Sequence, residues 1–198
     1  MTKVAQTAAP VIDAVSRRWS PRAFAQTPVK AADIKSMLEA ARWAASAYNE
    51  QPWRYIVATR DNEAEFNKLL GVLVEANQAW AKNAQVLMLS LAKKTYTLNG
   101  KPNRHAWHDV GMADAQLSLQ ASALGLATHW MAGFDGAKAV ETYGIPDDFE
   151  PVAALAIGYE GDPESLPEGY QKAEMAPRER KNHAELFFTG SFGNATKL

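Results

Sequence analysis

The sequence contains no cysteine among its 198 residues. Disulfide bonds, thiolate metal sites and cysteine nucleophiles are therefore excluded, and the composition suits a reducing compartment. No run of about 18 apolar residues occurs, and the apolar stretch near the amino terminus is too short for a signal peptide. We expect a soluble, cytoplasmic protein that has no membrane partner.

An excess of charge of one sign is also lacking. Twenty-one lysines and arginines stand against 22 aspartates and glutamates, so the formal net charge is −1. A nearly neutral chain has no overall field that attracts nucleic acid or an anionic membrane. We therefore expect no nucleic-acid partner, and a local cluster of basic residues becomes more informative.

Several motifs of familiar enzyme classes are absent. The sequence has no G-x-S-x-G nucleophile turn, no G-x-G-x-x-G dinucleotide turn, no G-x-x-x-x-G-K-[ST] phosphate loop and no H-E-x-x-H zinc motif. His105 and His108 have a spacing that fits one helical face, but no third ligand stands near them. We predict no metal site and no side-chain nucleophile.

Helical and strand patterns alternate along the chain without repeats or breaks in composition. With 47% hydrophobic residues, the chain is long enough to form one domain spanning 1–198. Apolar residues predict helices over 10–18, 32–45, 105–124 and 137–143, and strands over 55–60, 85–92, 127–131 and 153–158. The remainder, from Gly161 on, is predicted to be loop-rich. These elements indicate a domain of mixed α and β structure.

The segment RRWSPR, residues 17–22, places Arg18, Ser20 and Arg22 at alternate positions. In an extended backbone these side chains point the same way. Two guanidinium groups that flank a hydroxyl match a phosphate, because guanidinium donors pair bidentately with its oxygens. Taken alone, the segment leaves open two alternatives, a solvated basic turn and a kinase acceptor site at Ser20.

A second segment, AASAYNEQPW over 44–53, combines small and polar residues. Ala45, Ser46 and Ala47 are small enough for a flat ligand to approach the backbone closely. The Asn49 side chain offers both a donor and an acceptor to the edge of a heterocycle. The alternative is a polar loop that a buried Trp53 anchors.

Together these segments resemble the FMN-dependent nitroreductase family, in which R-x-S-x-R is followed by a small-small-S-A-x-N-x-Q-P-W loop. The resemblance continues at Asn77, over 109–135 and in PRERK, residues 177–181. Trp19 stands where many members carry arginine or histidine, and Ala45 where many carry proline. The resemblance implies an α+β fold with a central mixed, mainly antiparallel sheet flanked by helices, and an intertwined homodimer.

The resemblance also implies a tightly bound FMN. Arg18, Ser20, Arg178 and Arg180 would hold the phosphate and the ribityl chain, with Trp19 contributing from the same segment. Several charge-assisted hydrogen bonds are expected there, because a phosphomonoester is nearly dianionic.

The flavin ring would be held by a different set of residues. Arg22 would lie near N1 and O2 of the ring, and Asn77 would bind the same uracil-like edge. Met131, Ala132 and Gly133 would face the isoalloxazine, with the Ala132 N–H directed toward N5. The AASAYNEQPW loop, with Ala45, Ser46, Ala47 and Asn49, would bind the cofactor too, Ser46 and Asn49 coming from the partner subunit.

The implied activity is that of an oxidoreductase. FMN would take hydride from NADPH or NADH and reduce a nitroaromatic, a quinone or a similar small acceptor in a ping-pong cycle. Two alternatives stay open: an FMN carrier or redox-sensing module with little turnover, and a specialised flavin reaction such as reductive dehalogenation. Neither the acceptor nor the preferred nicotinamide follows from one sequence.

Three further expectations concern regions around this site. Residues 93–104 are predicted to form a mobile polar loop near the substrate entrance. Trp43, Trp80 and Trp107 belong either to the wall of the substrate pocket or to core and interface. Phe187, Phe188 and Phe192 are more apolar than a free terminus requires, so we expect them to pack across the partner subunit.

Overall fold

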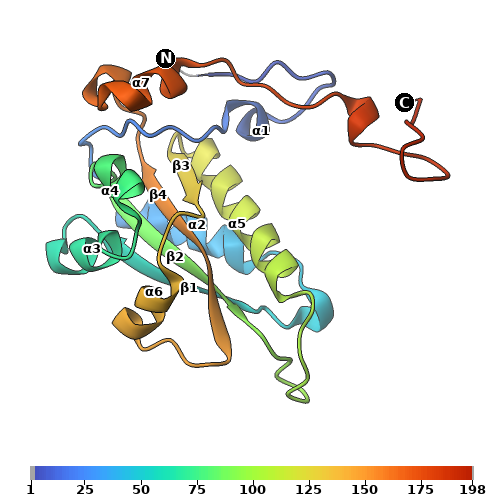
Figure 1. Cartoon of the computed structure of the whole chain (residues 1–198), viewed down its shortest axis with the longest axis horizontal. Helices are drawn as coiled ribbons and strands as arrows, with labels where there is room; N and C mark the ends of the chain where they lie inside the picture. The colour runs from blue at the N-terminus through green and yellow to red at the C-terminus, as the bar shows by residue number, and fades with distance from the viewer. Residues whose placement is uncertain (1–2, 198) are drawn as a thin grey trace.

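A four-stranded sheet forms the centre of the protein in the computed structural model, which describes residues 3–197 (Figure 1). Its strands, in the order β1-β2-β4-β3, are β1 (Trp53–Thr59), β2 (Val86–Lys93), β4 (Phe149–Gly158) and β3 (Ala127–Met131). Every neighbouring pair is antiparallel. The α+β fold with a mainly antiparallel sheet is thus confirmed, and all four strands occur where the sequence predicts them, although β4 begins earlier.

The central strand β2 is apolar on both of its faces. Leu87, Leu89 and Leu91 pack into one hydrophobic core, whereas Val86 and Met88 pack into a second. Successive side chains of a strand point to opposite faces, so one core lies on each side of the sheet. The long apolar run of β2, interrupted only by the buried Ser90, follows from this burial on both sides.

Helices cover both faces of the sheet (Figure 1). The helices α2 (Ala31–Arg42) and α5 (Ala106–Ala123) contribute to one core, and α3 (Glu63–Leu70), α4 (Glu75–Ala81) and α6 (Gly136–Tyr143) contribute to the other. The predicted helix ends are confirmed at Gly125 and Gly144, whose φ values of 76° and 59° suit glycine.

The sequence patterns miss three helices and overstate one. The helices α3, α4 and α7 (Glu168–Met175) are only seven or eight residues long, too short for an apolar period to stand out in the sequence. The prediction of loops beyond Gly161 is therefore wrong at α7. The first helix, α1, spans only Asp13–Arg17, and Ile12 is 66% exposed, so the apolar residues that predicted it do not pack on the core of their own chain.

The two terminal segments lie together at one end of the molecule (Figure 1). Lys3 Nζ donates to the carbonyl oxygens of Glu174 and Ala176, and the Ala5 N–H donates to the carbonyl of Ser16. Beyond Ala176 the chain extends away from the sheet, and Phe192 is 95% exposed. Within residues 3–197, no helix combines the length and the apolar character needed to cross a membrane.

Candidate functional site

Arg18 and Ser20 lie together, as the alternating pattern predicts. Arg18 Nη1 is 3.3 Å from Ser20 Oγ, and both residues are partly buried. Burial, and then the nearby charges of Arg178 and Arg180, lower the pKa of the Arg18 guanidinium. The structure thus brings the amino-terminal and carboxyl-terminal arginines into one cluster.

Arg178 also makes hydrogen bonds to the backbone of the amino-terminal segment. Its guanidinium donates to the carbonyl oxygens of Lys3, Ser16 and Arg18 at 2.7–2.8 Å. Burial and the charge of Arg180 lower its pKa. Arg178 therefore braces the segment that carries Arg18, a role that its place in the PRERK motif did not reveal.

The arginine cluster borders a cavity of about 740 Å³ between the two terminal segments. Its charged lining consists of the basic residues Arg18, Arg178, Arg180, Lys181 and His183 and one acidic residue, Glu179. Among the described residues 3–197, none of the three arginines forms an ion pair with a carboxylate. Like charges repel when they are gathered without a counter-charge, so an anion would stabilise this arrangement.

Trp19 turns its side chain to neighbours outside this cluster. The indole Nε1 donates to Glu160 Oε1 at 2.7 Å, and Lys3 Nζ lies 4.7 Å from the centroid of the ring. The indole therefore packs between a carboxylate and an ammonium group in the place where the family often has a basic side chain.

Arg22 is fixed through its backbone by a buried carboxylate. Glu174, on α7, is 2% exposed, and it accepts from the N–H of Arg22 at 2.9 Å and from the N–H of Ala23 at 3.1 Å. The Arg22 guanidinium lies 5.9 Å from the centroid of the buried Trp80 ring. Sequence reasoning missed Glu174, because a lone glutamate in a polar stretch is normally exposed.

Asn77 and Gly133 contact each other directly. Asn77 Nδ2 donates to the Gly133 carbonyl at 2.9 Å, and the Val74 N–H donates to the same oxygen at 3.1 Å. A Cβ on Gly133 would lie 2.6 Å from Asn77 Nδ2. Glycine is thus required here by the close approach of α4, a reason different from the open flavin face that the resemblance suggested.

The residues beside Gly133 differ in exposure. Met131 is buried at the end of β3, whereas Ala132 is exposed. On the same strand, burial lowers the pKa of His129 to about 4, so the ring is neutral at pH 7 and its Nδ1 lies 2.9 Å from the Pro21 carbonyl. This contact joins β3 to the segment of Arg18 and Arg22.

The AASAYNEQPW loop lies elsewhere. The Ala47 N–H donates to Asp109 Oδ2 at 3.0 Å, in the first turn of α5, whereas Arg18 lines a small cavity with Ser122 and Gly125 at the other end of that helix. At 1.5 Å per residue, Asp109 and Ser122 are about 20 Å apart. One chain therefore does not bring Ala45, Ser46, Ala47 and Asn49 together with the arginine cluster.

This loop has an unusual backbone. Tyr48, Asn49 and Gln51 have φ values of 54°, 54° and 50°, which residues with a Cβ rarely adopt. The Gln51 N–H donates to Ser46 Oγ at 3.0 Å, which helps to close the turn. Strain of this kind clusters at functional sites. No glycine marks the turn, and Asn49 is its only residue that commonly adopts such a φ, so the local signal is weak.

The histidines and tryptophans that the sequence singled out lie either on the surface or in the core. His105 and His108 are exposed, and in the described part of the chain no group of three or more histidine, aspartate or glutamate side chains could hold a metal ion. Trp80 is fully buried in the core, whereas Trp43 and Trp107 are 72% and 50% exposed. Trp80 is thus a core residue of its own chain.

Residues 15–159 match the model of the Nitroreductase family. The chain belongs to the nitroreductase family. The resemblance to this family is thus confirmed, and the predicted class, an oxidoreductase of the nitroreductase type, is confirmed with it.

Individual relatives agree with this membership. A crystal structure described as an oxidoreductase containing FMN is 36% identical, with a TM-score of 0.90 and coverage of 96% of both chains. A nitroreductase family protein from Clostridium difficile 630 is 26% identical, with a TM-score of 0.71 and coverage of 92% of this chain and 99% of that one. The NADH dehydrogenase of Thermus thermophilus is 28% identical, covering 86% of this chain and 95% of its own.

Proposed function

We propose that this protein is a cytoplasmic, single-domain FMN enzyme that oxidises NADPH or NADH and reduces small acceptors such as nitroaromatics or quinones in a ping-pong cycle. The observation that carries the proposal is the cluster of Arg18, Arg178 and Arg180 beside a large cavity, none of which forms an ion pair with a carboxylate among residues 3–197. The similar solved structure described as containing FMN supports the same cofactor.

The residues present fit the phosphate end of FMN. Guanidinium groups and a hydroxyl are the donors that a phosphate dianion prefers, and Arg18, Ser20 and Arg180 supply them beside the cavity. Arg178 contributes its charge while it braces the segment. Trp19 would act through its backbone, since its side chain is engaged with Glu160.

The isoalloxazine ring of FMN would be bound by residues on or next to β3 and α4. We assign Arg22 and Asn77 to the polar edge of the ring, and the backbone of Met131, Ala132 and Gly133 to its face. Ala132 is exposed, so its N–H is a suitable donor toward N5. The hydrogen bond from Asn77 to the Gly133 carbonyl fixes α4 relative to the backbone that follows β3.

We also propose that the site is shared between two subunits of a homodimer. Ser46 and Asn49 are separated from the arginine cluster by about the length of α5, so a second copy would have to supply them. Large apolar residues exposed in the single chain support such an interface; they include Ile12, Tyr48, Leu98, Leu186, Phe187 and Phe192.

The protein's own contribution to the reaction is position and charge. FMN, when bound, supplies the redox chemistry by accepting hydride from the nicotinamide and passing electrons to the acceptor. Arg18, Ser20 and Arg180 anchor its phosphate, and the Arg22 guanidinium places a positive charge beside the ring. No acid, base or nucleophile from the chain is assigned to the chemical step.

An absorption spectrum tests the proposal. The purified protein is incubated with FMN, freed of excess and recorded before and after anaerobic addition of NADPH and then NADH. We expect bound flavin bands that bleach with at least one nicotinamide and return with a quinone. Bands that persist with both would favour a carrier, and the absence of bound flavin would overturn the proposal.

A further inference from the structure

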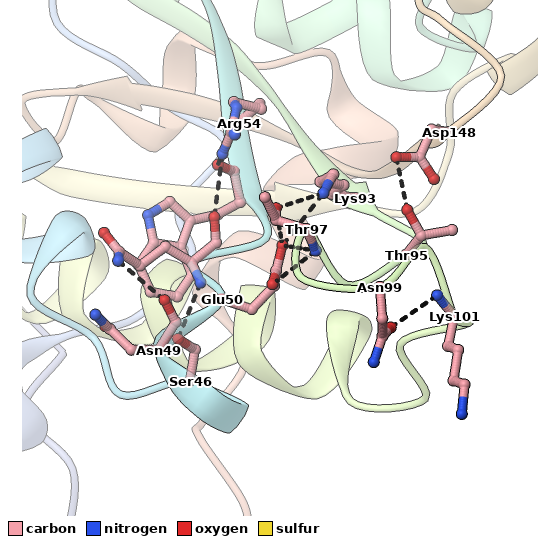
Figure 2. A network of polar contacts seen from close by, with 12 residues as sticks. Ser46, Asn49, Glu50, Arg54, Lys93, Thr95, Thr97, Asn99, Lys101 and Asp148 are labelled. Carbon is pink, nitrogen blue, oxygen red and sulfur yellow. Dashed lines mark hydrogen bonds and ion pairs between the residues drawn. The ribbon is translucent and has the colours of Figure 1, made fainter.

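Glu50 is a buried acid within an exposed turn. Its side chain is 7% exposed, although Tyr48 and Asn49 beside it are both exposed. The carboxylate accepts two hydrogen bonds from the Thr97 N–H, at 2.9 and 3.0 Å, and one from Thr97 Oγ1 at 2.5 Å. Lys93 Nζ lies 3.2 Å away (Figure 2). Burying a carboxylate is costly unless it is paired in this way.

Glu50 lies in the middle of the strained turn. Tyr48 and Asn49 before it and Gln51 after it have left-handed φ values. Such a backbone persists only when surrounding contacts determine it. Inside the turn, the bond from the Gln51 N–H to Ser46 Oγ closes a ring (Figure 2). The Ala47 N–H ties this ring to Asp109 on α5, and Glu50 ties it to Thr97.

The segment that Glu50 contacts is itself firmly held. Thr95 pairs with Pro102 across a short antiparallel bridge, Thr95 Oγ1 donates to Asp148 Oδ2 at 2.9 Å, and the Lys94 N–H donates to the Asp148 carbonyl at 2.7 Å. Figure 2 shows this chain of contacts running from the turn to Asp148. Residues 93–104 thus form a braced hairpin, and the mobility of this polar segment stays a prediction.

The same contacts set the side chains around the turn. The Tyr48 and Tyr96 rings meet edge to face, with centroids 5.9 Å apart. Arg54 Nη1 donates to the Gln51 and Trp53 carbonyls at 3.1 and 2.7 Å (Figure 2). Lys93 and the hydrogen bonds from Thr97 outweigh the effect of burial and lower the pKa of Glu50, so the carboxylate is charged at neutral pH.

We propose that Glu50 is a positioning residue that holds the 46–51 turn in its left-handed form and thereby presents Ser46 and Asn49 to the cofactor of the opposite subunit. This inference rests on the proposed function. The Glu50 carboxylate is engaged by Thr97 and Lys93, so we assign it no contact with the cofactor. It acts through Thr97, which belongs to the 93–104 hairpin. The contacts of this hairpin with Asp148 hold Thr97, and through it the turn, in place.

The variants Glu50→Gln and Glu50→Ala distinguish this positioning role from a general contribution of Glu50 to the stability of the fold. The strongest partners of Glu50 are the neutral N–H and hydroxyl of Thr97, so glutamine keeps an acceptor for them and alanine keeps none. In FMN-free protein, hydrogen exchange should show loss of protection over 46–51 and 95–102 for alanine and retention for glutamine. Glu141→Ala, an exposed glutamate on α6, is the control.

Flavin titrations then test the link to the cofactor. We expect Glu50→Ala to weaken FMN and riboflavin about equally, by roughly tenfold, because Asn49 and Ser46 serve the ring and not the phosphate. Glu50→Gln should stay within about threefold of wild type. Equal loss in glutamine and alanine, or unchanged affinity in alanine, would overturn the positioning role.

A mixed dimer distinguishes this proposal from the proposed function. Subunits carrying Arg18→Ala are combined with subunits carrying Glu50→Ala, each with its own tag. Because the two residues would serve one site from opposite subunits, the mixed dimer should regain one site of wild-type FMN affinity. A mixed dimer without such a site would overturn the inference. Failure of the unsubstituted protein to bind FMN would instead overturn the proposed function.

Discussion

The Arg178 guanidinium donates to the carbonyl oxygen of Arg18 at 2.8 Å. This bond joins two basic motifs from opposite ends of the chain, and a second bond from Arg178 to the Ser16 carbonyl fixes the same segment. The carbonyl dipoles of Ser16 and Arg18 thus offset part of the repulsion between the clustered guanidinium groups. The guanidinium of Arg18 faces the cavity between the terminal segments.

Replacing Arg18 by alanine should weaken the binding of FMN and leave the binding of riboflavin unchanged. A hydrogen bond to a charged group contributes about 1.5–3 kcal/mol, so the dissociation constant for FMN should rise roughly ten- to a hundredfold. Riboflavin lacks the phosphate and should bind as it does to wild type. Fluorescence titration measures both, with the neighbouring Arg17→Ala as control. Equal losses for the two flavins would contradict a phosphate site at Arg18.

Replacing Glu174 by glutamine should destabilise the protein. The buried carboxylate accepts from the N–H groups of Arg22 and Ala23, and glutamine offers them one oxygen without the charge. We expect a loss of about 1–2 kcal/mol in the free energy of unfolding. Urea denaturation measures it, and Glu168→Gln, an exposed glutamate on the same helix, should be neutral.

How far the sequence predicts this structure depends on what each element buries. The strand β2 and the helix α5 bury regular apolar faces, so their patterns were sufficient. The helix α7 is anchored through Glu174, whose charge suggests exposure. The turn around Glu50 has left-handed residues without glycine, since contacts with Thr97 enforce what local preference opposes. Tertiary contacts of single polar residues therefore escaped prediction.

Asp114 should make stability depend on pH. It lies in the core with Tyr55 Oη at 2.7 Å and Ser90 Oγ at 3.2 Å, and burial raises its pKa from 3.8 to about 6. The folded state therefore holds a proton that the unfolded state releases. The contribution of Asp114 is fully present below about pH 4 and is lost as the pH rises through 6.

Asp114→Asn isolates this effect. The uncharged amide still accepts from Tyr55, so unfolding at pH 7 should require about 2–3 kcal/mol more than in wild type. Between pH 4 and 6 the difference between the two proteins should grow with pH. Urea titrations at several pH values measure it. A constant difference would show that Asp114 does not titrate in this range.

A side chain at Gly133 should clash with α4. The Cβ of Gly133→Ala would lie 2.6 Å from Asn77 Nδ2 and 3.0 Å from Val74 Cγ2, so the Asn77 side chain must shift and its hydrogen bond to Gly133 is weakened. We expect a loss of about 1–3 kcal/mol. In an Asn77→Ala background the same substitution should cost less by at least about 0.5 kcal/mol. Simple additivity would mean that the cost comes from the contact with the Val74 side chain and not from Asn77.

Ending the chain at Ala184 should weaken the dimer without unfolding the subunit. Leu186 and Phe187 are 48% and 50% exposed in the single chain, and Phe192 is 95% exposed, so they contribute little to the core of their own subunit. Their apolar surface would be buried only against a partner. Sedimentation should therefore show a shift toward monomer, while the near-ultraviolet spectrum of the sheet core stays unchanged. Full-length Phe192→Ser should show a smaller shift in the same direction, because it removes one ring from that surface. A truncated protein that remains a tight dimer would place the interface on other exposed residues, such as Tyr48 and Leu98.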